Sequence, residues 1–493
     1  MRKVKVRTLY LIAIIVGGLV GLATKSTYAM FTASAEIDNP ICMSANLTSE
    51  EETIETMEVV VTAGEKKTVP VTINNTSTNT VGYSVWYTSP SDKVKIGIKL
   101  SNSDSSNSTD TISSNGSKKV YVQIINNSSS SVTITLGVIS NKTSNDMTLI
   151  PNTELDFSVN LVTYIKNLYT NTAKTTTTLD SVTYNLASSV GLMNDRKGSM
   201  STGIDAGNIR YYGANPNNYI YFNCSDYSNQ SSDTCETWRI IGVFDGKVKI
   251  MRGSQIGTYS WDNKNKDTGA ETAYGKNDWN TARLMKLLNP SKYYEVDSND
   301  NGNVQSLYWN AQSGTCFSGQ NNATTSCDFT STGLKNDTTR NMIAETTYYT
   351  RGHNSNRIFV DAMYDKERVS GTVYSGRSTS WTGKIAIPYP SDYGYAADLS
   401  QCQQQLYYYN DATCTANNWM KNIVTNNGGN VGWLLTPRSD SASIAWYVYS
   451  SGRVTGSYYA SYAYGVAPVL SLSSELGIVA GTGTDSEPYQ LSV

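Results

Sequence analysis

Short apolar runs separated by polar clusters fill the first third of the chain. From about residue 36 to residue 162 these runs are rich in Val, Ile and Thr, and several alternate apolar with polar positions. They are Val59–Val61, Lys67–Ile73, Tyr83–Tyr87, Val94–Leu100, Lys119–Ile125 and Val132–Val138. Because several short strands with turn signals between them are typical of two packed sheets, residues 36–162 are predicted to form a β-sandwich.

A threonine-rich segment, residues 163–205, interrupts this pattern. One weak helical patch, Leu161–Leu168, overlaps its start. Because the segment has no sustained apolar period, it is predicted to be a linker between two domains.

A second domain is expected over residues 206–493. Its strongest local signal is a β-hairpin, in which Trp238–Phe244 and Lys247–Met251 flank Asp245-Gly246. That dipeptide suits a tight primed turn. Further strands are expected at Lys384–Ile387, Val431–Thr436, Ile444–Ser450, Arg453–Tyr458 and Gly465–Leu472.

Two short helices are predicted within this second domain. In Thr281–Leu288, the residues Ala282, Met285 and Leu288 lie on one helical face, with Asn280 as the N-cap and Asn289-Pro290 as the stop. The second predicted helix is Asp337–Tyr349, with Asp337 as its cap. Two helices followed by a β-rich C-terminal part indicate an α+β domain.

The first 29 residues have the order of a secretory signal. Basic residues at positions 2, 3, 5 and 7 precede an uncharged apolar run, Thr8–Ala23, and Thr27-Tyr28-Ala29 offers small residues where cleavage would need them. The apolar run has 16 residues, whereas a spanning helix usually needs about 20. We therefore expect a signal peptide or, alternatively, an uncleaved N-terminal membrane anchor. Membrane contact is expected only through this segment.

Charge and composition narrow the class of partner. The net charge is −2, and Lys and Arg do not cluster after the first residues. This argues against a nucleic-acid partner, which needs a basic face. The 35 tyrosines stand among abundant Asn, Ser, Thr and Gly, a mixture typical of recognition surfaces. Composition alone also fits a neutral extracellular β-protein without a specific binding surface.

Six of the seven cysteines fall into three local couples. They are Cys224 with Cys235, Cys316 with Cys327, and Cys402 with Cys414. Neighbour pairing is the simplest connectivity and would support export, because disulfides belong to oxidising compartments. Free thiols are the alternative. The spacing within the couples and the single histidine argue against zinc, so no metal or cofactor is expected.

Catalytic signatures are sparse. The one histidine, His353, lies in a loop-like context, without a Gly-x-Ser-x-Gly elbow or a His-Glu-x-x-His motif nearby. Paired carboxylates of a glycosidase have no local spacing rule, so this enzyme class stays open. The chain is predicted not to be an enzyme.

Five segments of the second domain carry a recognisable pattern. They are Asn208–Ile220, Cys235–Val243, Leu284–Pro290, Tyr389–Tyr395 and Gly465–Leu470. Together they resemble a large family of exported surface proteins of gut Gram-positive bacteria. The resemblance covers about residues 206–475 and implies a C-type-lectin-like fold. That fold is shared with the variable proteins of diversity-generating retroelements and with formylglycine-generating enzymes, whose reactive cysteine pair is not matched by the loop-flanking couples here.

The segment Gly64–Asn75 in turn resembles the early strands of immunoglobulin-like modules on bacterial surface proteins. It lacks the inter-sheet cysteines of antibody domains, so the resemblance is one of architecture. The fold expected is multidomain, with an N-terminal all-β immunoglobulin-like sandwich followed by an α+β C-type-lectin-like domain.

In lectin-like variable proteins the last β-hairpins build the ligand surface, and the corresponding stretch here is Arg438–Tyr464. At period two, Ile444, Trp446 and Val448 are expected to face the core. The chain departs from the pattern at Ala467, where Arg is frequent. The resemblance implies a ligand surface made of Arg438, Ser439, Asp440, Tyr447, Tyr449, Arg453, Tyr458, Tyr459, Tyr462 and Tyr464. The alternative is that these tyrosines only cover a second face of the sheet.

The function expected from these observations is that of an adhesin-like binding protein, secreted or on the cell surface. Its lectin-like module would recognise an extracellular glycan or protein. A structural matrix or fibre component is the first alternative, and a secreted enzyme such as a glycosidase is the second.

Overall fold

The computed structural model divides the chain into two compact units between residues 157 and 158, called unit 1 and unit 2 below. The described residues are 43–47, 54–63, 65–99, 107–128, 130–140, 148–153, 155, 158–198, 207–264, 273–296 and 305–492. The predicted signal segment 1–29 and Cys42 lie outside them. Among the described residues, no helix combines the length and apolar character that crossing a bilayer requires.

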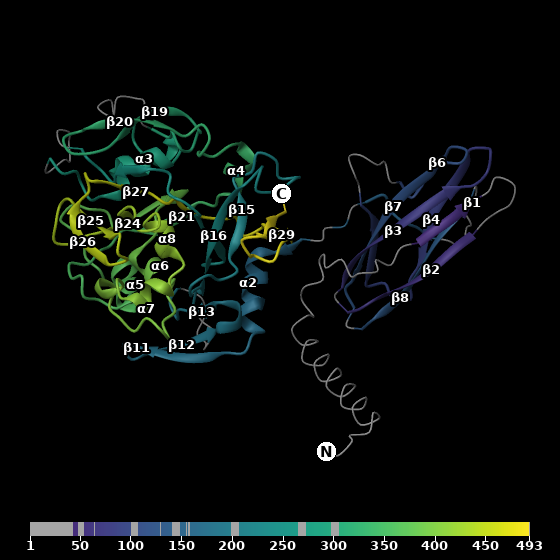
Figure 1. The fold of residues 1–493 in the computed structure, drawn as a ribbon, viewed down its shortest axis with the longest axis horizontal. Coiled ribbons are helices and arrows are strands. Elements are labelled where there is room, and N and C mark those ends of the chain that lie inside the picture. Colours follow the sequence, from purple (N-terminus) through teal and green to yellow (C-terminus); the bar gives the residue numbers. More distant parts are fainter. Residues whose placement is uncertain are drawn as a thin grey trace, which may run out of the picture. The chain divides into compact units, whose positions relative to one another are not determined.

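Unit 1 consists of two β-sheets that share one hydrophobic core (Figure 1). One sheet has the order β1-β3-β7-β5, and the other has the order β2-β8-β4-β6 with β9 paired to β4. Val69, Val71 and Ile73 of β3 are fully buried and pack in one cluster with Leu136 and Val138 of β8. This burial of alternate residues is the period-two pattern that predicts the strands. The strands are β1 (Met43–Leu47), β2 (Ile54–Val61), β3 (Lys66–Asn75), β4 (Val81–Thr88), β5 (Val94–Ile98), β6 (Thr109–Ile112), β7 (Ser117–Asn126), β8 (Val132–Ser140) and β9 (Thr148–Leu149).

Unit 2 contains a nine-stranded sheet of order β11-β12-β13-β14-β16-β17-β28-β23, with β15 paired to β16. Its other sheets are β18-β27-β24-β25-β26, β10-β29-β30, and the hairpins β19-β20 and β21-β22. The strands are β10 (Val159–Asn160), β11 (Thr175–Leu179), β12 (Val182–Ala187), β13 (Leu192–Asn194), β14 (Ile209–Tyr211), β15 (Tyr219–Phe222), β16 (Glu236–Phe244), β17 (Lys247–Arg252), β18 (Thr258–Ser260), β19 (Ser313–Phe317), β20 (Thr324–Asp328), β21 (Thr346–Tyr349), β22 (Ser380–Gly383), β23 (Ile385–Ala386), β24 (Gly432–Pro437), β25 (Ile444–Val448), β26 (Val454–Tyr459), β27 (Ala463–Gly465), β28 (Val469–Ser471), β29 (Gly477–Ala480) and β30 (Gln490–Leu491).

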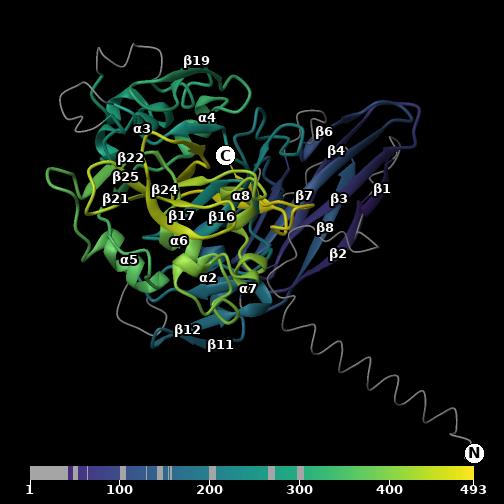
Figure 2. The same ribbon diagram turned by 60° about the vertical axis from the view of Figure 1, so that its left-hand side comes forward.

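Helices pack on both faces of the nine-stranded sheet (Figure 2). Ile240 and Ile250 belong to a cluster with Ile165 of α2, whereas Met251 belongs to a second cluster with Met363 of α5. A strand buried on both faces needs apolar residues at consecutive positions, which explains the apolar run Ile240–Phe244 within β16. The helices are α2 (Leu161–Thr170), α3 (Arg283–Leu288), α4 (Asp337–Met342), α5 (Val360–Arg368), α6 (Pro390–Tyr395), α7 (Ala412–Ala416) and α8 (Met420–Val424), with 3₁₀ turns η1 (Ser188–Val190), η2 (Trp279–Thr281), η3 (Ser291–Tyr293) and η5 (Leu406–Tyr408).

The segment interpreted from the sequence as a linker, residues 163–205, belongs to unit 2 over its described part, 163–198. It contributes most of α2 and all of β11, β12 and β13, which extend the nine-stranded sheet. The Asn160 side chain caps α2 by accepting a hydrogen bond from the amide of Thr163 (3.0 Å). The weak helical patch was therefore a real helix, and unit 2 begins about 48 residues before the predicted boundary at 206.

The predicted hairpin forms at the expected place, since Phe244 pairs with Lys247 across the turn. Asp245 and Gly246 both have positive φ, 47° and 75°, as a primed turn requires.

The two predicted helices are shorter than expected. Asp278 caps η2, and α3 begins only at Arg283, so Asn280 is not an N-cap. Asn336 rather than Asp337 caps α4, by accepting a hydrogen bond from the amide of Thr339 (2.9 Å). Beyond Met342 the chain becomes extended, because β21 pairs with β22 instead of continuing the helix.

Candidate functional site

The predicted ligand surface lies on the five-stranded sheet of unit 2, around the β25-β26 hairpin. Trp446 and Val448 are fully buried on one side of β25, while Ile444 is partly exposed at the start of the strand. Tyr447 points to the other side and is also buried, with 2% of its surface exposed. Both sides of this strand therefore pack, and one of the two packing layers is aromatic.

Seven aromatic rings form a continuous chain of contacts on that side. They are Trp433, Tyr447, Tyr464, Tyr458, Tyr462, Tyr459 and Tyr274. Tyr447 and Tyr458 stack with centroids 4.8 Å apart, and Tyr462 and Tyr464 stack with nearly parallel planes, 7° apart. We call the five tyrosines 447, 458, 459, 462 and 464 the tyrosine surface. The structure brings these five predicted residues together.

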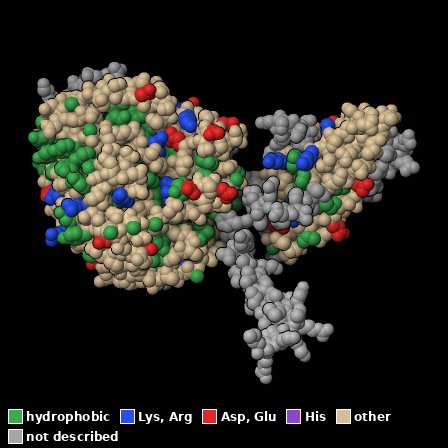
Figure 3. Space-filling view, viewed as in Figure 1, with side chains coloured by type: hydrophobic (Ala, Val, Ile, Leu, Met, Phe, Trp, Pro, Cys, Tyr) green, Lys and Arg blue, Asp and Glu red, His purple; other side chains and the backbone are tan. Residues whose placement is uncertain are grey.

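Solvent exposure differs among the residues of the tyrosine surface. Tyr447 is buried, Tyr458, Tyr459 and Tyr464 are partly exposed, and Tyr462 is 39% exposed. Figure 3 shows hydrophobic side chains gathered on the left of the view, over β25, β26 and β27. The inner rings thus pack in the core, as the alternative interpretation of these tyrosines expects. The outer rings are accessible to a partner.

The hydroxyls of Tyr447 and Tyr464 are uncharged at neutral pH. Burial raises the pKa of the Tyr447 hydroxyl to about 12, against the lowering effect of its hydrogen bond with Ser457 (2.6 Å). Burial likewise raises the pKa of Tyr464 above its ordinary value. These hydroxyls stay protonated and can both donate and accept hydrogen bonds.

Two contributors to this aromatic layer were missed from the sequence. Trp433 lies on β24 with its ring centroid 4.8 Å from that of Tyr464. Tyr274 stacks on Tyr459, with centroids 4.1 Å apart and planes 13° apart. Trp433 lies inside a predicted strand, whose apolar pattern predicts burial in the core and not a place in a ligand surface. Tyr274 comes from a segment distant in the chain, without any local pattern that points to it.

The polar residues predicted for the surface engage one another instead. Arg438 donates to both carboxylate oxygens of Asp440, at 2.6 and 3.2 Å, and also to the carbonyl of Gly456 (2.6 Å). Arg453 lies over the ring of Tyr407, 4.7 Å from its centroid. Arg438 and Asp440 therefore brace the hairpin.

Two other predicted residues do not join the tyrosine stack. Ser439 is partly exposed between Arg438 and Asp440. Tyr449 is 41% exposed next to the hairpin turn. Among the described residues, no ring contact joins Tyr449 to the tyrosine surface.

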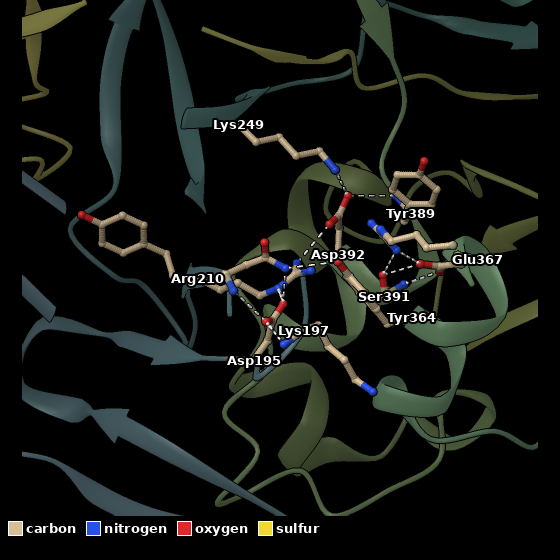
Figure 4. A network of polar contacts seen from close by, with 12 residues as sticks. Asp195, Lys197, Arg210, Lys249, Tyr364, Glu367, Tyr389, Ser391 and Asp392 are labelled. Atoms are coloured by element: carbon tan, nitrogen blue, oxygen red, sulfur yellow. Dashed lines mark hydrogen bonds and ion pairs between the residues drawn. The ribbon is translucent and has the colours of Figure 1, made fainter. Parts of the chain in front are cut away.

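A second polar centre, not predicted from the sequence, lies between the nine-stranded sheet and helices α5 and α6 (Figure 4). Asp392 is fully buried, accepts a hydrogen bond from Nη1 of Arg210 (3.0 Å) and pairs with Lys249. Arg210 also pairs with buried Asp195. Next to them, Glu367 pairs with Arg368 and accepts from the amide of Ser391 (2.9 Å).

Electrostatic balance keeps Asp392 ionised although it is buried. Burial alone would raise the pKa of Asp392, but Lys249, Arg210 and Arg368 outweigh it and hold that pKa below its ordinary value. Burial lowers the pKa of Lys249 to about 8, partly offset by Asp392. A buried charge persists only when it is paired in this way.

The three predicted cysteine couples are all bonded, as Cys224–Cys235, Cys316–Cys327 and Cys402–Cys414. Neighbour pairing is thus confirmed, and three disulfides are consistent with an exported protein.

The described residues contain no group of three or more His, Cys, Asp or Glu side chains placed to hold a metal ion. His353 is partly buried, and burial lowers its pKa. Its carbonyl accepts a hydrogen bond from the indole of Trp446 (3.3 Å), so its backbone supports the strand that carries Tyr447.

Comparison with known proteins adds little. No protein-family model and no curated protein matches the chain. Among solved structures, it is similar to the periplasmic inhibitor of g-type lysozyme, PliG, of Salmonella Typhimurium (TM-score 0.13) and of Aeromonas hydrophila (TM-score 0.12). Each shares 10% identity and covers 20% of this chain, and 98% and 99% of the respective inhibitors. Likeness at this level carries no argument about fold or function.

Proposed function

We propose that the chain is an exported binding protein, extracellular or at the cell surface, whose tyrosine surface recognises a ligand. In this proposal unit 1 is an immunoglobulin-like sandwich that serves as a stalk, and unit 2 is a lectin-like module that presents the ligand surface. The three disulfides and the β-rich two-unit architecture support this organisation.

The observation that carries the proposal is the outward continuation of the aromatic chain from buried Tyr447 to exposed Tyr462. Tyrosines that only covered a sheet face would be expected to end in buried rings. Here the last rings are held in place by stacking on buried neighbours, so that binding would cost little side-chain entropy. Rigid, amphipathic tyrosines of this kind are favoured in binding surfaces.

The class of ligand that fits best is a neutral carbohydrate. A sugar ring offers C–H groups that pack on aromatic faces and hydroxyls that pair with tyrosine hydroxyls. Arg438 and Asp440, which precede the hairpin, are already paired with each other, and Arg453 of the hairpin lies over the ring of Tyr407. The hairpin itself contributes a single charged side chain, Arg453, so its surface suits a neutral glycan better than a strongly charged ligand.

The test is binding of the intact, disulfide-bonded chain to immobilised glycans and, in parallel, to immobilised extracellular proteins. We expect binding to neutral glycans that is lost when Tyr458, Tyr459 and Tyr462 are changed together to Ala. Binding to proteins alone would show that the ligand is a protein and not a glycan. Binding that survives the triple change would show that the site lies elsewhere. Absence of binding in both formats, with filaments forming as concentration rises, would favour a structural matrix protein.

A further inference from the structure

Unit 2 contains a cavity of about 660 Å³ that shares no residue with the tyrosine surface. It lies beside the buried ion pairs, between the turn of the β16-β17 hairpin, strand β21 and the end of helix α5. Its volume is in the range of small-molecule sites. Aromatic walls come from Phe244, Tyr348, Tyr349, Tyr364 and Tyr389.

The cavity has more cationic than anionic side chains. Five lining residues are basic, namely Arg196, Lys197, Lys247, Lys249 and Arg368, and two are acidic, Asp245 and Asp365. Buried Asp392 pairs with Lys249, and buried Glu367 pairs with Arg368. Even when these two carboxylates are added to the acids, the basic side chains are in excess by one. An anion would find this balance favourable.

Arg368 is the group best placed to meet such an anion. Its guanidinium lies between two rings, 3.9 Å from the centroid of Tyr364 and 4.0 Å from that of Tyr389. Nη1 is engaged with Glu367 and Ser391. Among the described residues none accepts a hydrogen bond from Nε or Nη2, and the side chain is 11% exposed where it lines the cavity.

This geometry leaves one edge of a rigid guanidinium fork unused. The Nε–Nη2 edge matches the two oxygens of a carboxylate, which it binds with two parallel hydrogen bonds. Because the two tyrosines already fix the plane of the guanidinium, little side-chain freedom would be lost on binding. Lys249, at the cavity floor with its charge shared with Asp392, adds to the positive potential.

Another part of the cavity wall suits a sugar ring. Tyr349 is 43% exposed and lines the cavity, so part of its ring is accessible. Its carbonyl accepts a hydrogen bond from the hydroxyl of Tyr389 (2.8 Å), which ties the two walls together. Hydroxyl-bearing Thr346, Thr347 and Ser471 complete the lining.

We propose that this cavity binds a carboxylate-bearing sugar unit, such as a uronic acid. The carboxylate pairs with the free edge of Arg368, and the sugar ring packs on Tyr349. This site shares no residue with the tyrosine surface, so its test is independent of the function proposed above.

The test is calorimetric titration of the full chain with methyl β-glucuronide and with methyl β-glucoside, which differ only in the carboxylate. We expect the glucuronide to bind at least tenfold more tightly. Benzoate and inorganic sulfate serve as further probes. Equal affinity for the two sugars, no binding of the glucuronide, or tighter binding of benzoate or sulfate than of the glucuronide would overturn the proposal.

Three variants locate the site. Arg368→Lys keeps a positive charge beside buried Glu367 but removes the fork, and it should lower glucuronide affinity at least tenfold. Tyr349→Ala, at an exposed position, should lower it about fivefold. Tyr408→Ala, an exposed tyrosine away from the cavity, should leave it unchanged. If Arg368→Lys failed to fold, Tyr349→Ala would decide alone, and unchanged affinity in that variant would contradict the site.

Discussion

The ring of Tyr458 stacks on the ring of Tyr447, with centroids 4.8 Å apart and planes inclined by 14°. The two residues come from adjacent strands, β25 and β26, and their contact joins the buried layer of unit 2 to its exposed tyrosines. Such aromatic pairs contribute about 0.5–1.5 kcal/mol beyond the area they bury. The contact therefore couples the stability of the hairpin to the position of the proposed ligand surface.

This coupling is measurable by a double-mutant cycle with Tyr447→Leu and Tyr458→Leu. Eight of the nine tryptophans lie in unit 2, so tryptophan fluorescence during urea unfolding reports chiefly on that unit. We expect an interaction energy of about 1 kcal/mol between the two positions. Additive effects would show that the rings are neighbours without mutual stabilisation.

The buried carboxylate of Asp392 is expected to be a major determinant of stability. Asp392→Asn leaves Lys249 and Arg210 facing a neutral amide, and removing one partner from a buried ion pair costs about 3–5 kcal/mol. Denaturant unfolding at neutral pH measures this loss. Asp337→Asn is the matched control, because Asp337 pairs with Arg340 while 89% exposed, and it should change the free energy of unfolding far less.

The cost of Asp392→Asn should depend on pH. The pKa of Asp392 is lower in the folded protein than in the unfolded chain, where it lies near 3.9. The contribution of this carboxylate is thus complete above about pH 5 and is lost as the pH falls through the folded-state pKa. The difference in stability between wild type and Asp392→Asn should shrink between pH 5 and pH 3. A difference that stayed constant or grew over that range would contradict the assignment.

The Cys402–Cys414 disulfide closes a loop of 12 residues, and both cysteines are fully buried. Closing a loop of this size contributes roughly 3 kcal/mol in the chain-entropy model. Replacing both cysteines by Ala should lower the free energy of unfolding of unit 2 by about that amount. The single change Cys42→Ala serves as the control. Equal stability of the double variant and the wild type would show that the bond adds nothing to the native state.

Local signals in the sequence predicted the parts of this fold that depend on neighbours in the chain. The strands of unit 1 alternate apolar and polar residues because each sheet has one buried face. The Asp245-Gly246 turn and the cysteine couples are equally local. The β11-β12 hairpin was missed because four of the five residues of β11 are threonines, three of them exposed, which give no apolar period.

In the candidate sites, too, the sequence predicted what depends on neighbours in the chain and missed what depends on the tertiary fold. Five tyrosines within 18 residues of sequence, 447 to 464, could be placed on one surface because they belong to consecutive strands. Tyr274 could not, since only the tertiary fold stacks it on Tyr459. The Asp392 network includes a hydrogen bond between residues 182 positions apart, and each of its members looks like an ordinary residue in the sequence.

The most direct test of the proposed binding function compares two tyrosines of equal exposure. Tyr462, on the tyrosine surface, and Tyr408, on η5, are each 39% exposed. Isothermal titration of the full chain with its tightest neutral glycan should show at least a tenfold loss of affinity for Tyr462→Ala. Affinity should remain within twofold of wild type for Tyr408→Ala. Equal affinities of the two variants, or a loss confined to Tyr408→Ala, would contradict the account.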